Sequence, residues 1–249
     1  MNKNNVIDSG AESVNQLLDG GYEKNIITTI YGPAGAGKTN LMLIALCHCI
    51  NNGGKVLYVD TEGSFSVERV NQILPDFSSK AKQVTFLRPY TFEEQKQAVI
   101  KVKETVEKDP KEFAMIIIDS IAMLYRLEVG KTLDVQFVNK ELGLQLGLLT
   151  EITRKYSVPI LITNQVYADF DNPNGIKMVG GDLLKYTSKC LIELKKGHHG
   201  LRVATLMKHR SLPEGREIAF RIIQSGIETA QIPTIATRVR DDSPPEDLI

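Results

Sequence analysis

Residues 32–39, with the sequence GPAGAGKT, constrain the fold of this chain more than any other feature. They match the pattern G-x-x-x-x-G-K-[ST], they follow the apolar run NIITTIYG, and they open a stretch typical of a helix. In such a strand–loop–helix unit, glycines let backbone N–H groups close around phosphate oxygens, and the helix N-terminus adds partial positive charge. The segment therefore predicts a phosphate loop in a nucleotide-binding α/β domain.

The residue types in this loop and one distant carboxylate predict how a nucleotide and Mg²⁺ would be held. We expect Lys38 to reach the β- and γ-phosphates and Thr39 to ligate Mg²⁺. Asp119 ends the apolar run MIIID, where a carboxylate beside the phosphate loop would hold Mg²⁺ through water, although it could instead cap the next element. The predicted nucleotide contacts of the loop and the following helix are Gly32, Pro33, Ala34, Gly35, Ala36, Gly37, Lys38, Thr39 and Asn40.

The order of apolar runs predicts the rest of the architecture. Runs typical of strands (KVLYVD, VTFLRP, FAMIIID, VPILITNQ) alternate with helical stretches, among them one within residues 91–108. This alternation predicts a mostly parallel central sheet flanked by helices on both faces. After Gln165 the polar segment VYADFDNPNGIKMVGG predicts a loop, and three closely spaced runs predict a C-terminal antiparallel extension. We expect one domain over residues 1–228 and an acidic, disordered tail over residues 229–249.

Two polar side chains at strand ends are further candidates for the site. The segment YVDTEGSF carries Glu62 to the edge of the sheet where open α/β sheets bind ligands. A carboxylate there can orient or deprotonate an attacking water, but Asp60 competes for this role, and Glu62 could also be a solvated loop acid. Gln165 in ILITNQV could bind a γ-phosphate or that water and so couple the nucleotide to the next loop, or it could only cap the strand.

Composition excludes few classes of protein, but the distribution of charge indicates which part of the chain could bind a polyanion. The chain carries 30 Lys and Arg against 30 Asp and Glu, so no global field attracts nucleic acid. Residues 151–225 hold 12 basic and 7 acidic residues, a net charge of +5, and would meet a polyanion first. Cys47, Cys49 and Cys190 are expected to be buried thiols. No apolar run approaches the ~18 residues that span a bilayer, and we expect a cytoplasmic protein without a membrane partner.

Two cations flank His209 in the segment LMKHRSLPEGRE. Residues two apart on a strand share a face, so Lys208 and Arg210 are expected to project together, with His209 packed on the other side. From the residues alone they are either solvated cations at a strand end or cations aimed at an anionic site.

Taken together, these segments resemble the ATPase core of RecA-like recombinases, and most closely the RadB proteins of archaea. The resemblance runs from about Asp8 to Glu228 and rests on SGAESVNQLLDGGYEKNIITTIYGPAGAGKTNL, VLYVDTEGSFSVERV, MIIIDSIAMLYRLE, VPILITNQV and SLPEGREIAFRIIQSGI. It implies a RecA-like fold that binds ATP and Mg²⁺. Full recombinases also carry an N-terminal helical domain and a Phe-x-x-Ala plug that docks into a neighbour. The sequence shows neither, so we do not expect self-assembly through that plug.

The resemblance assigns roles to individual positions. Glu62 matches the family's catalytic glutamate, Gln165 the glutamine at the head of the second DNA-binding loop, and Arg69 an arginine that packs on adenine. Residues 125–134 match the first DNA-binding loop and residues 167–179 the second. The implied DNA contacts are Arg126, Lys131 and Lys177. Lys208 and Arg210 are similar to the finger pair of clock-type ATPases and ring helicases, which reaches the γ-phosphate of a neighbouring subunit.

The resemblance implies an ATP-binding, DNA-binding accessory protein of homologous recombination and DNA repair. Its ATPase would be weak, and it would not exchange strands on its own. The implied partners are single-stranded DNA, the main RadA-type recombinase and further copies of the chain. Three alternatives stay open: a clock or signalling ATPase that does not bind DNA, a small-molecule kinase, and a protein that uses ATP only as a clamp. A kinase would need an acceptor pocket and a lid, for which we find no segment.

Overall fold

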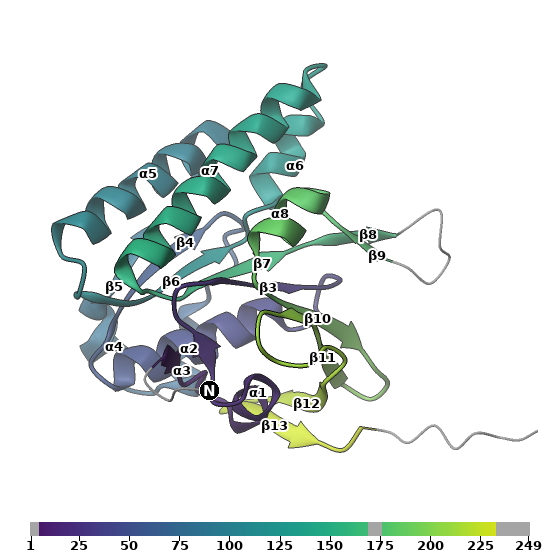
Figure 1. Ribbon diagram of the computed structural model, residues 1–249. Helices are drawn as coiled ribbons and strands as arrows, with labels where there is room; N and C mark the ends of the chain where they lie inside the picture. Colours follow the sequence, from purple (N-terminus) through teal and green to yellow (C-terminus); the bar gives the residue numbers. More distant parts are fainter. Residues whose placement is uncertain (1–4, 169–175, 233–249) are drawn as a thin grey trace, which may run out of the picture.

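A nine-stranded sheet forms the centre of the computed structural model, which describes residues 5–168 and 176–232 (Figure 1). The strand order is β13-β12-β11-β10-β3-β7-β6-β4-β5. Neighbours from β10 to β5 are parallel, whereas β10 to β13 pair antiparallel, which confirms the predicted architecture. The strands are β3 (Ile27–Tyr31), β4 (Lys55–Asp60), β5 (Val84–Leu87), β6 (Phe113–Asp119), β7 (Ile160–Asn164), β10 (Cys190–Lys196), β11 (Leu201–His209), β12 (Glu217–Ile223) and β13 (Gly226–Ala230).

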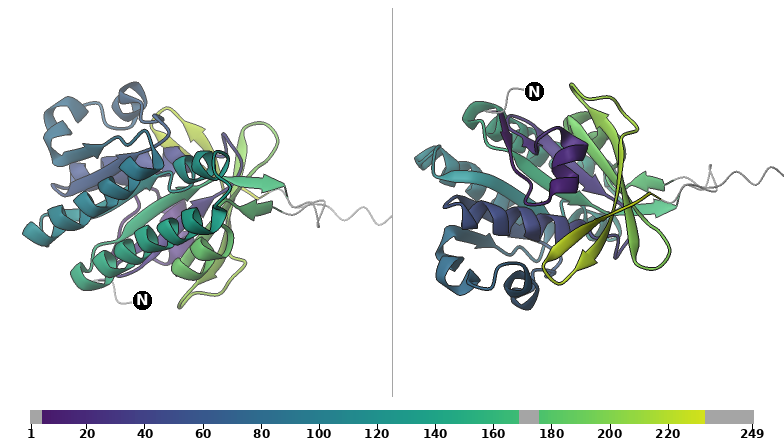
Figure 2. Two further views of the ribbon diagram at one scale, coloured as in Figure 1. Left: turned by 90° about the horizontal axis from the view of Figure 1, so that it is seen from above. Right: turned by 90° about the horizontal axis from the view of Figure 1, so that it is seen from below.

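Helices cover both faces of the sheet, as the two views of Figure 2 show. One face carries α1 (Glu12–Leu18), α2 (Lys38–Asn51), α3 (Val67–Ile73) and α4 (Phe77–Lys80). The other carries α5 (Phe92–Lys108), α6 (Met123–Val129), α7 (Val135–Tyr156) and α8 (Gly181–Thr187). A small antiparallel pair, β1 (Val6–Ile7) with β2 (Tyr22–Glu23), flanks α1.

The central strands are apolar on both sides because each side is covered by helices. In β6, Ile117 belongs to the core on the α2 side, whereas Ile116 and Ile118 belong to the core on the α5 and α7 side. All three side chains are fully buried. This alternation explains why the run MIIID lacks the polar positions of a half-exposed strand, and it delivers Asp119 to the end of a buried strand.

Helix starts differ in a way that bears on function. Ser66 and Thr91 accept hydrogen bonds from backbone N–H groups in the first turns of α3 and α5, and Asp134 does the same for α7. In contrast, α2 begins after Gly37, which has a φ of 104° and provides no side-chain cap. The N-terminus of α2 therefore leaves backbone donors for an external anion.

Two segments that the resemblance or the polar composition marked as loops contain regular structure. Residues 125–129 of the first predicted loop belong to α6, because Leu124 and Tyr125 bury their side chains in the core beside α5 and α7. In the second, β8 (Val166–Ala168) pairs antiparallel with β9 (Ile176–Met178), and residues 169–175 lie outside the described part of the chain. Strand β13 also runs past the predicted domain boundary at 228, while residues 233–249 of the predicted tail lie outside the described part.

Cys47, Cys49 and Cys190 are buried and form no disulfide, as predicted. Burial raises the pKa of the Cys49 thiol to about 11, so this thiol stays protonated near neutral pH. Within the described residues, no helix combines the length and the apolar composition that crossing a bilayer would require.

Candidate functional site

The phosphate loop joins the end of β3 to the start of α2. Pro33, Ala34 and Gly35 are exposed at its tip, so phosphates can approach the loop from solvent. Gly32 has a φ of 153°, and a Cβ built on it would lie 2.3 Å from the Leu194 carbonyl oxygen, so only glycine fits there. The Lys38 ammonium donates to the Gly32 carbonyl at 2.8 Å and to the Pro33 carbonyl at 3.1 Å. The Lys38 side chain therefore folds back onto the phosphate loop, where it is predicted to contact the nucleotide.

The predicted Mg²⁺ ligands lie side by side. The Thr39 hydroxyl donates to Asp119 Oδ2 at 2.8 Å, and the hydroxyls of Tyr58 and Ser64 donate to the same oxygen at 3.0 and 3.1 Å. Thr163 donates to the other carboxylate oxygen. Burial raises the pKa of Asp119, and the hydrogen bonds from Thr163, Thr39 and Tyr58 oppose this rise.

This oxygen donor set fits Mg²⁺, which binds through one or two carboxylates and completes its shell with water and phosphate oxygens. Thr39 and Asp119 would hold the ion beside the phosphate loop. The described residues contain no group of three or more His, Cys, Asp and Glu that could hold a metal without such help.

Glu62 and Gln165 come together at the same edge of the sheet. The Gln165 side-chain amide donates to Glu62 Oε1 at 2.8 Å, and the Ser120 hydroxyl donates to the same oxygen at 2.7 Å. Glu62 is otherwise exposed. Asp60 is buried, and its carboxylate accepts the backbone N–H groups of Ser64 and Phe65 at 3.2 and 3.3 Å. Asp60 therefore holds the turn, while Glu62 remains open to a water molecule.

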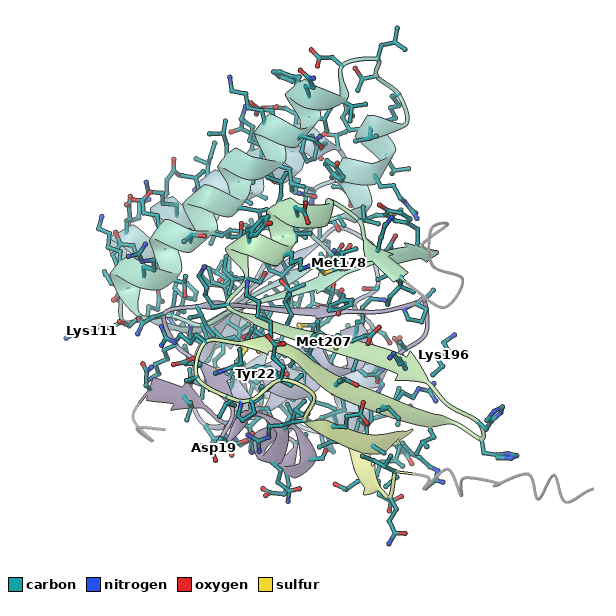
Figure 3. All side chains as sticks on the ribbon, turned by 45° about the vertical axis from the view of Figure 1, so that its right-hand side comes forward. Asp19, Tyr22, Lys111, Met178, Lys196 and Met207 are labelled. Carbon is teal, nitrogen blue, oxygen red and sulfur yellow. The ribbon has the colours of Figure 1, made fainter. Side chains whose placement is uncertain are left out.

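Two cations near the phosphate loop were missed by sequence reasoning. The Arg202 guanidinium donates to the Gly35 carbonyl at 3.4 Å, and the Lys196 ammonium lies 3.0 Å from where a Cβ on Gly35 would be. Figure 3 labels Lys196 on the β10–β11 hairpin. No motif marks either residue; they reach the loop because β10 pairs with β3 in parallel.

Arg69 of α3 lies against the N-terminal turn of α2, next to the phosphate loop. Its Nε donates to Asn40 Oδ1 at 2.8 Å, and its other donors meet Gln72 and the backbone of the turn between β12 and β13. The predicted adenine contact is thus held within reach of the loop by hydrogen bonds that no local sequence pattern indicates.

The expectation that Lys208 and Arg210 project side by side is wrong. Strand β11 ends at His209, so the alternation of the strand does not extend to Arg210. The Lys208 ammonium donates to the Lys185 and Ser188 carbonyls at 2.7 and 2.9 Å, at the end of α8. The Arg210 Nε donates to both carboxylate oxygens of Glu23 at 3.0 Å.

The position of these cations bears on their predicted role. His209 pairs with Cys190 on β10, and Cys190 pairs with Thr28 near the start of β3. Lys208 and Arg210 therefore lie near the start of β3, whereas the phosphate loop follows its end. Neither cation serves the nucleotide site of its own chain. The His209 side chain is only 2% exposed, which confirms that it packs inward.

The candidate DNA contacts are distributed over two elements. Arg126 lies in α6, Lys131 follows that helix, and Lys177 lies in β9; all are exposed. Sequence reasoning missed Met123, whose sulfur lies 3.8 Å from both the Arg126 guanidinium and the Gln165 amide. Met123 therefore connects α6, which carries the candidate DNA contact Arg126, to Gln165, which contacts Glu62.

Comparisons with known proteins agree with this arrangement. A family model described as Rad51 matches residues 2–230. A "DNA repair and recombination protein RadB" from Methanosphaera stadtmanae is 44% identical over 218 residues, which cover 86% of this chain and 92% of the relative. A protein of the same description from Thermococcus sibiricus is 37% identical over 228 residues, covering 90% of this chain and 95% of the relative.

The fold has a similar counterpart among solved structures. A chain described as "Crystal structure of the RadB recombinase" aligns with a TM-score of 0.76 at 35% sequence identity. The alignment covers 91% of the chain described here and 100% of the other.

Proposed function

Because the chain belongs to the Rad51 family and has the RecA-like fold, we propose that it is an ATP-binding, DNA-binding accessory protein of homologous recombination with weak ATP hydrolysis. DNA repair and recombination is the function of the family to which its relatives belong. One observation carries the finer proposal. The Gln165 amide bonds the Glu62 carboxylate at 2.8 Å, directly before the β8–β9 hairpin. This bond joins a candidate catalytic base to a candidate DNA-binding segment.

The proposed chemistry is in-line hydrolysis of the γ-phosphate. Glu62 orients and polarises the attacking water, because it is the exposed carboxylate at this edge. Lys38 neutralises charge on the β- and γ-phosphates and keeps the loop closed around them. Mg²⁺, when bound by Thr39 and Asp119, supplies further charge neutralisation between the phosphates.

The proposed DNA ligand is a single strand. Arg126, Lys131 and Lys177 are exposed cations of the kind that bind phosphates without reading sequence. Such binding weakens steeply with salt. Gln165 contacts both Glu62 and Met123, the first residue of α6. A change at the nucleotide that moves Gln165 would therefore change the contacts of α6.

The proposed protein partners are further copies of this chain and the main RadA-type recombinase. In a homo-oligomer, Lys208 and Arg210 would serve the nucleotide of a neighbour, since they lie far from the phosphate loop of their own chain. Arg210 would then exchange its bond with Glu23 for one with phosphate. Arginine fingers contribute about 10³–10⁵ in rate, so a chain without a neighbour would hydrolyse ATP slowly.

A titration with fluorescently labelled single-stranded DNA tests the proposal. At about 50 mM salt, with Mg²⁺ and ATP, anisotropy should rise with protein concentration, and affinity should fall steeply as salt increases. Lys38→Ala should abolish ATP binding and remove the effect of ATP on DNA affinity, while binding in the absence of nucleotide persists. No DNA affinity at about 50 mM salt would overturn the proposal and favour a signalling ATPase that does not bind DNA.

A further inference from the structure

The guanidinium group of Arg69 uses every hydrogen-bond donor it has. An arginine side chain carries five N–H donors in one plane. Asn40, Gln72 and backbone carbonyls of the β12–β13 turn accept them. The contacts are Nε to Asn40 Oδ1 (2.8 Å), one terminal nitrogen to Gln72 Oε1 (2.8 Å) and the Gln224 carbonyl (2.9 Å), and the other to the Ile223 and Gly226 carbonyls (2.8 and 3.0 Å).

These acceptors come from different parts of the fold. Asn40 belongs to α2, Gln72 belongs to α3 together with Arg69, and the carbonyls belong to the β12–β13 turn and the strand residues on either side of it. Because acceptors surround the edge of the guanidinium plane, both the position and the tilt of the plane are fixed. With its donors used, the group can make a further contact only through its two faces.

The fixed plane lies next to the phosphate loop. Asn40 directly follows Thr39, the last residue of the loop, and touches Arg69 at 2.8 Å. A nucleotide with its phosphates on the loop therefore has its base within reach of Arg69. Guanidinium faces stack on aromatic rings, and such contacts need no hydrogen-bond donors from the arginine. The N–H donors of Arg69 therefore fix the position of its guanidinium group, and a face of the group can stack on the nucleotide base.

We propose that Asn40 is a positioning residue for base recognition, which holds the Arg69 plane in the orientation that stacks on the nucleotide base. This inference rests on the proposed binding of ATP and extends it to a residue that does not itself contact the base. Asn40 accepts the bond to Nε, whereas the turn carbonyls accept only from the terminal nitrogens. Without Asn40, the Nε donor loses its acceptor and the plane is held only through its two terminal nitrogens.

The test compares two ligands that differ by the nucleoside. Calorimetric titration with Mg²⁺ gives the Kd for ATP and for inorganic tripolyphosphate, and the ratio of the two reports the contribution of the base. Asn40→Ala should weaken ATP binding about 3- to 10-fold more than it weakens tripolyphosphate binding, the range of a lost cation–π contact. Asn40→Asp keeps an acceptor for Nε and should keep the wild-type ratio, even if its charge weakens both ligands.

The matched control is Asn51→Ala. Asn51 lies at the other end of α2, and its Oδ1 accepts a hydrogen bond from Lys80 at 2.7 Å, so this variant also removes one amide–cation contact from the same helix. It should bind both ligands like the wild type. A thermal melt of each variant establishes that it is folded at the titration temperature.

The remaining outcomes separate the inference from the proposed function. If Asn40→Ala weakens both ligands equally, Asn40 acts through the phosphate loop and the inference is overturned. An unchanged Kd for ATP overturns it as well. If the wild type binds tripolyphosphate as tightly as ATP, the base contributes nothing, which overturns the inference but leaves phosphate binding at the loop intact. A wild type that binds neither ligand overturns the proposed function itself.

Discussion

The side-chain amide of Gln165 lies 2.8 Å from the Glu62 carboxylate and joins the end of β7 to the turn after β4. The same amide lies 3.8 Å from the Met123 sulfur at the start of α6. A water molecule that donates to Glu62 competes with Gln165 for this carboxylate. Occupation of the nucleotide site therefore changes the contacts of a residue that directly precedes the β8–β9 hairpin.

Glu62→Gln should separate nucleotide binding from turnover. The amide keeps the shape of the side chain but cannot accept a proton, so turnover should fall about 10²- to 10⁴-fold while the Kd for ATP stays near the wild-type value. Phosphate release and calorimetry measure the two quantities. Glu68→Gln, on the exposed side of α3, should have no effect on either. Undiminished turnover in Glu62→Gln would require another base, with Asp60 the nearest acid in sequence.

Removing Arg126 and Lys131 should weaken binding to single-stranded DNA without changing ATP affinity. Each phosphate contact on a single strand contributes about 0.7 to the slope of log K against log salt, so the double alanine variant should lose about 1.4 from that slope. Anisotropy titrations at several salt concentrations measure it.

Lys111→Ala is the control for charge. Lys111 precedes β6, whereas Arg126 lies beyond the other end of that strand, and Figure 3 labels Lys111 far from α6. This variant should keep the wild-type slope. An unchanged slope in the double variant would place the DNA on another surface.

Arg210→Ala tests whether this cation acts on a neighbouring subunit. At low protein concentration the variant and the wild type should both hydrolyse ATP slowly. At high concentration the wild type should accelerate at least about tenfold, because an arginine finger contributes in trans, and the variant should not. Arg221→Ala removes an exposed cation of β12 and should accelerate like the wild type. If Arg210→Ala also accelerates, the bond between Arg210 and Glu23 serves only the stability of the chain.

We expect the protein to lose stability in mild acid because of the buried His209 side chain. Burial lowers the pKa of His209 below the ordinary value of 6.5, and its Nδ1 accepts the backbone N–H groups of Ser211 and Leu212 at 3.2 Å, which requires the unprotonated form. As the pH falls below about 6.5, the unfolded chain binds a proton that the folded chain does not, so the free energy of unfolding decreases; above this pH the effect disappears. Urea denaturation at pH 7.5 and pH 5.5 measures the difference (~2 pH units across the ordinary pKa).

His209→Asn should show a smaller decrease between these two conditions than the wild type. His198→Asn, on the exposed β10–β11 turn, should keep the wild-type decrease. Equal decreases in His209→Asn and the wild type would assign the acid sensitivity to other groups.

Much of the site could be located from the sequence because parallel strands end at a common edge. That rule predicts Glu62, Asp119 and Gln165 near the phosphate loop from the sequence alone, and the structure brings them there. Their catalytic and metal-binding roles remain predictions. The rule says nothing about residues that arrive from distant strands, which is why Lys196 and Arg202 were missed.

The predictions that were wrong concern residues whose conformation is decided by contacts with distant parts of the chain. Lys208 and Arg210 would share a face if β11 continued, but the strand ends at His209, and Glu23 from β2 captures the arginine. Likewise, α6 forms in a segment expected to be a loop because Leu124 and Tyr125 find an apolar core. Neither partner is visible in the sequence around these residues.

The most direct test of coupling between ATP hydrolysis and DNA is the rate of hydrolysis with and without single-stranded DNA, measured over a range of protein concentrations. We expect slow turnover of the dilute protein, and faster turnover when DNA is added and when protein concentration rises. Gln165→Ala should bind ATP and DNA but lose the stimulation by DNA, because the link from Glu62 to α6 and the β8–β9 hairpin is cut. A rate that is the same with and without DNA at every protein concentration would show that DNA and ATP hydrolysis are not coupled in this protein.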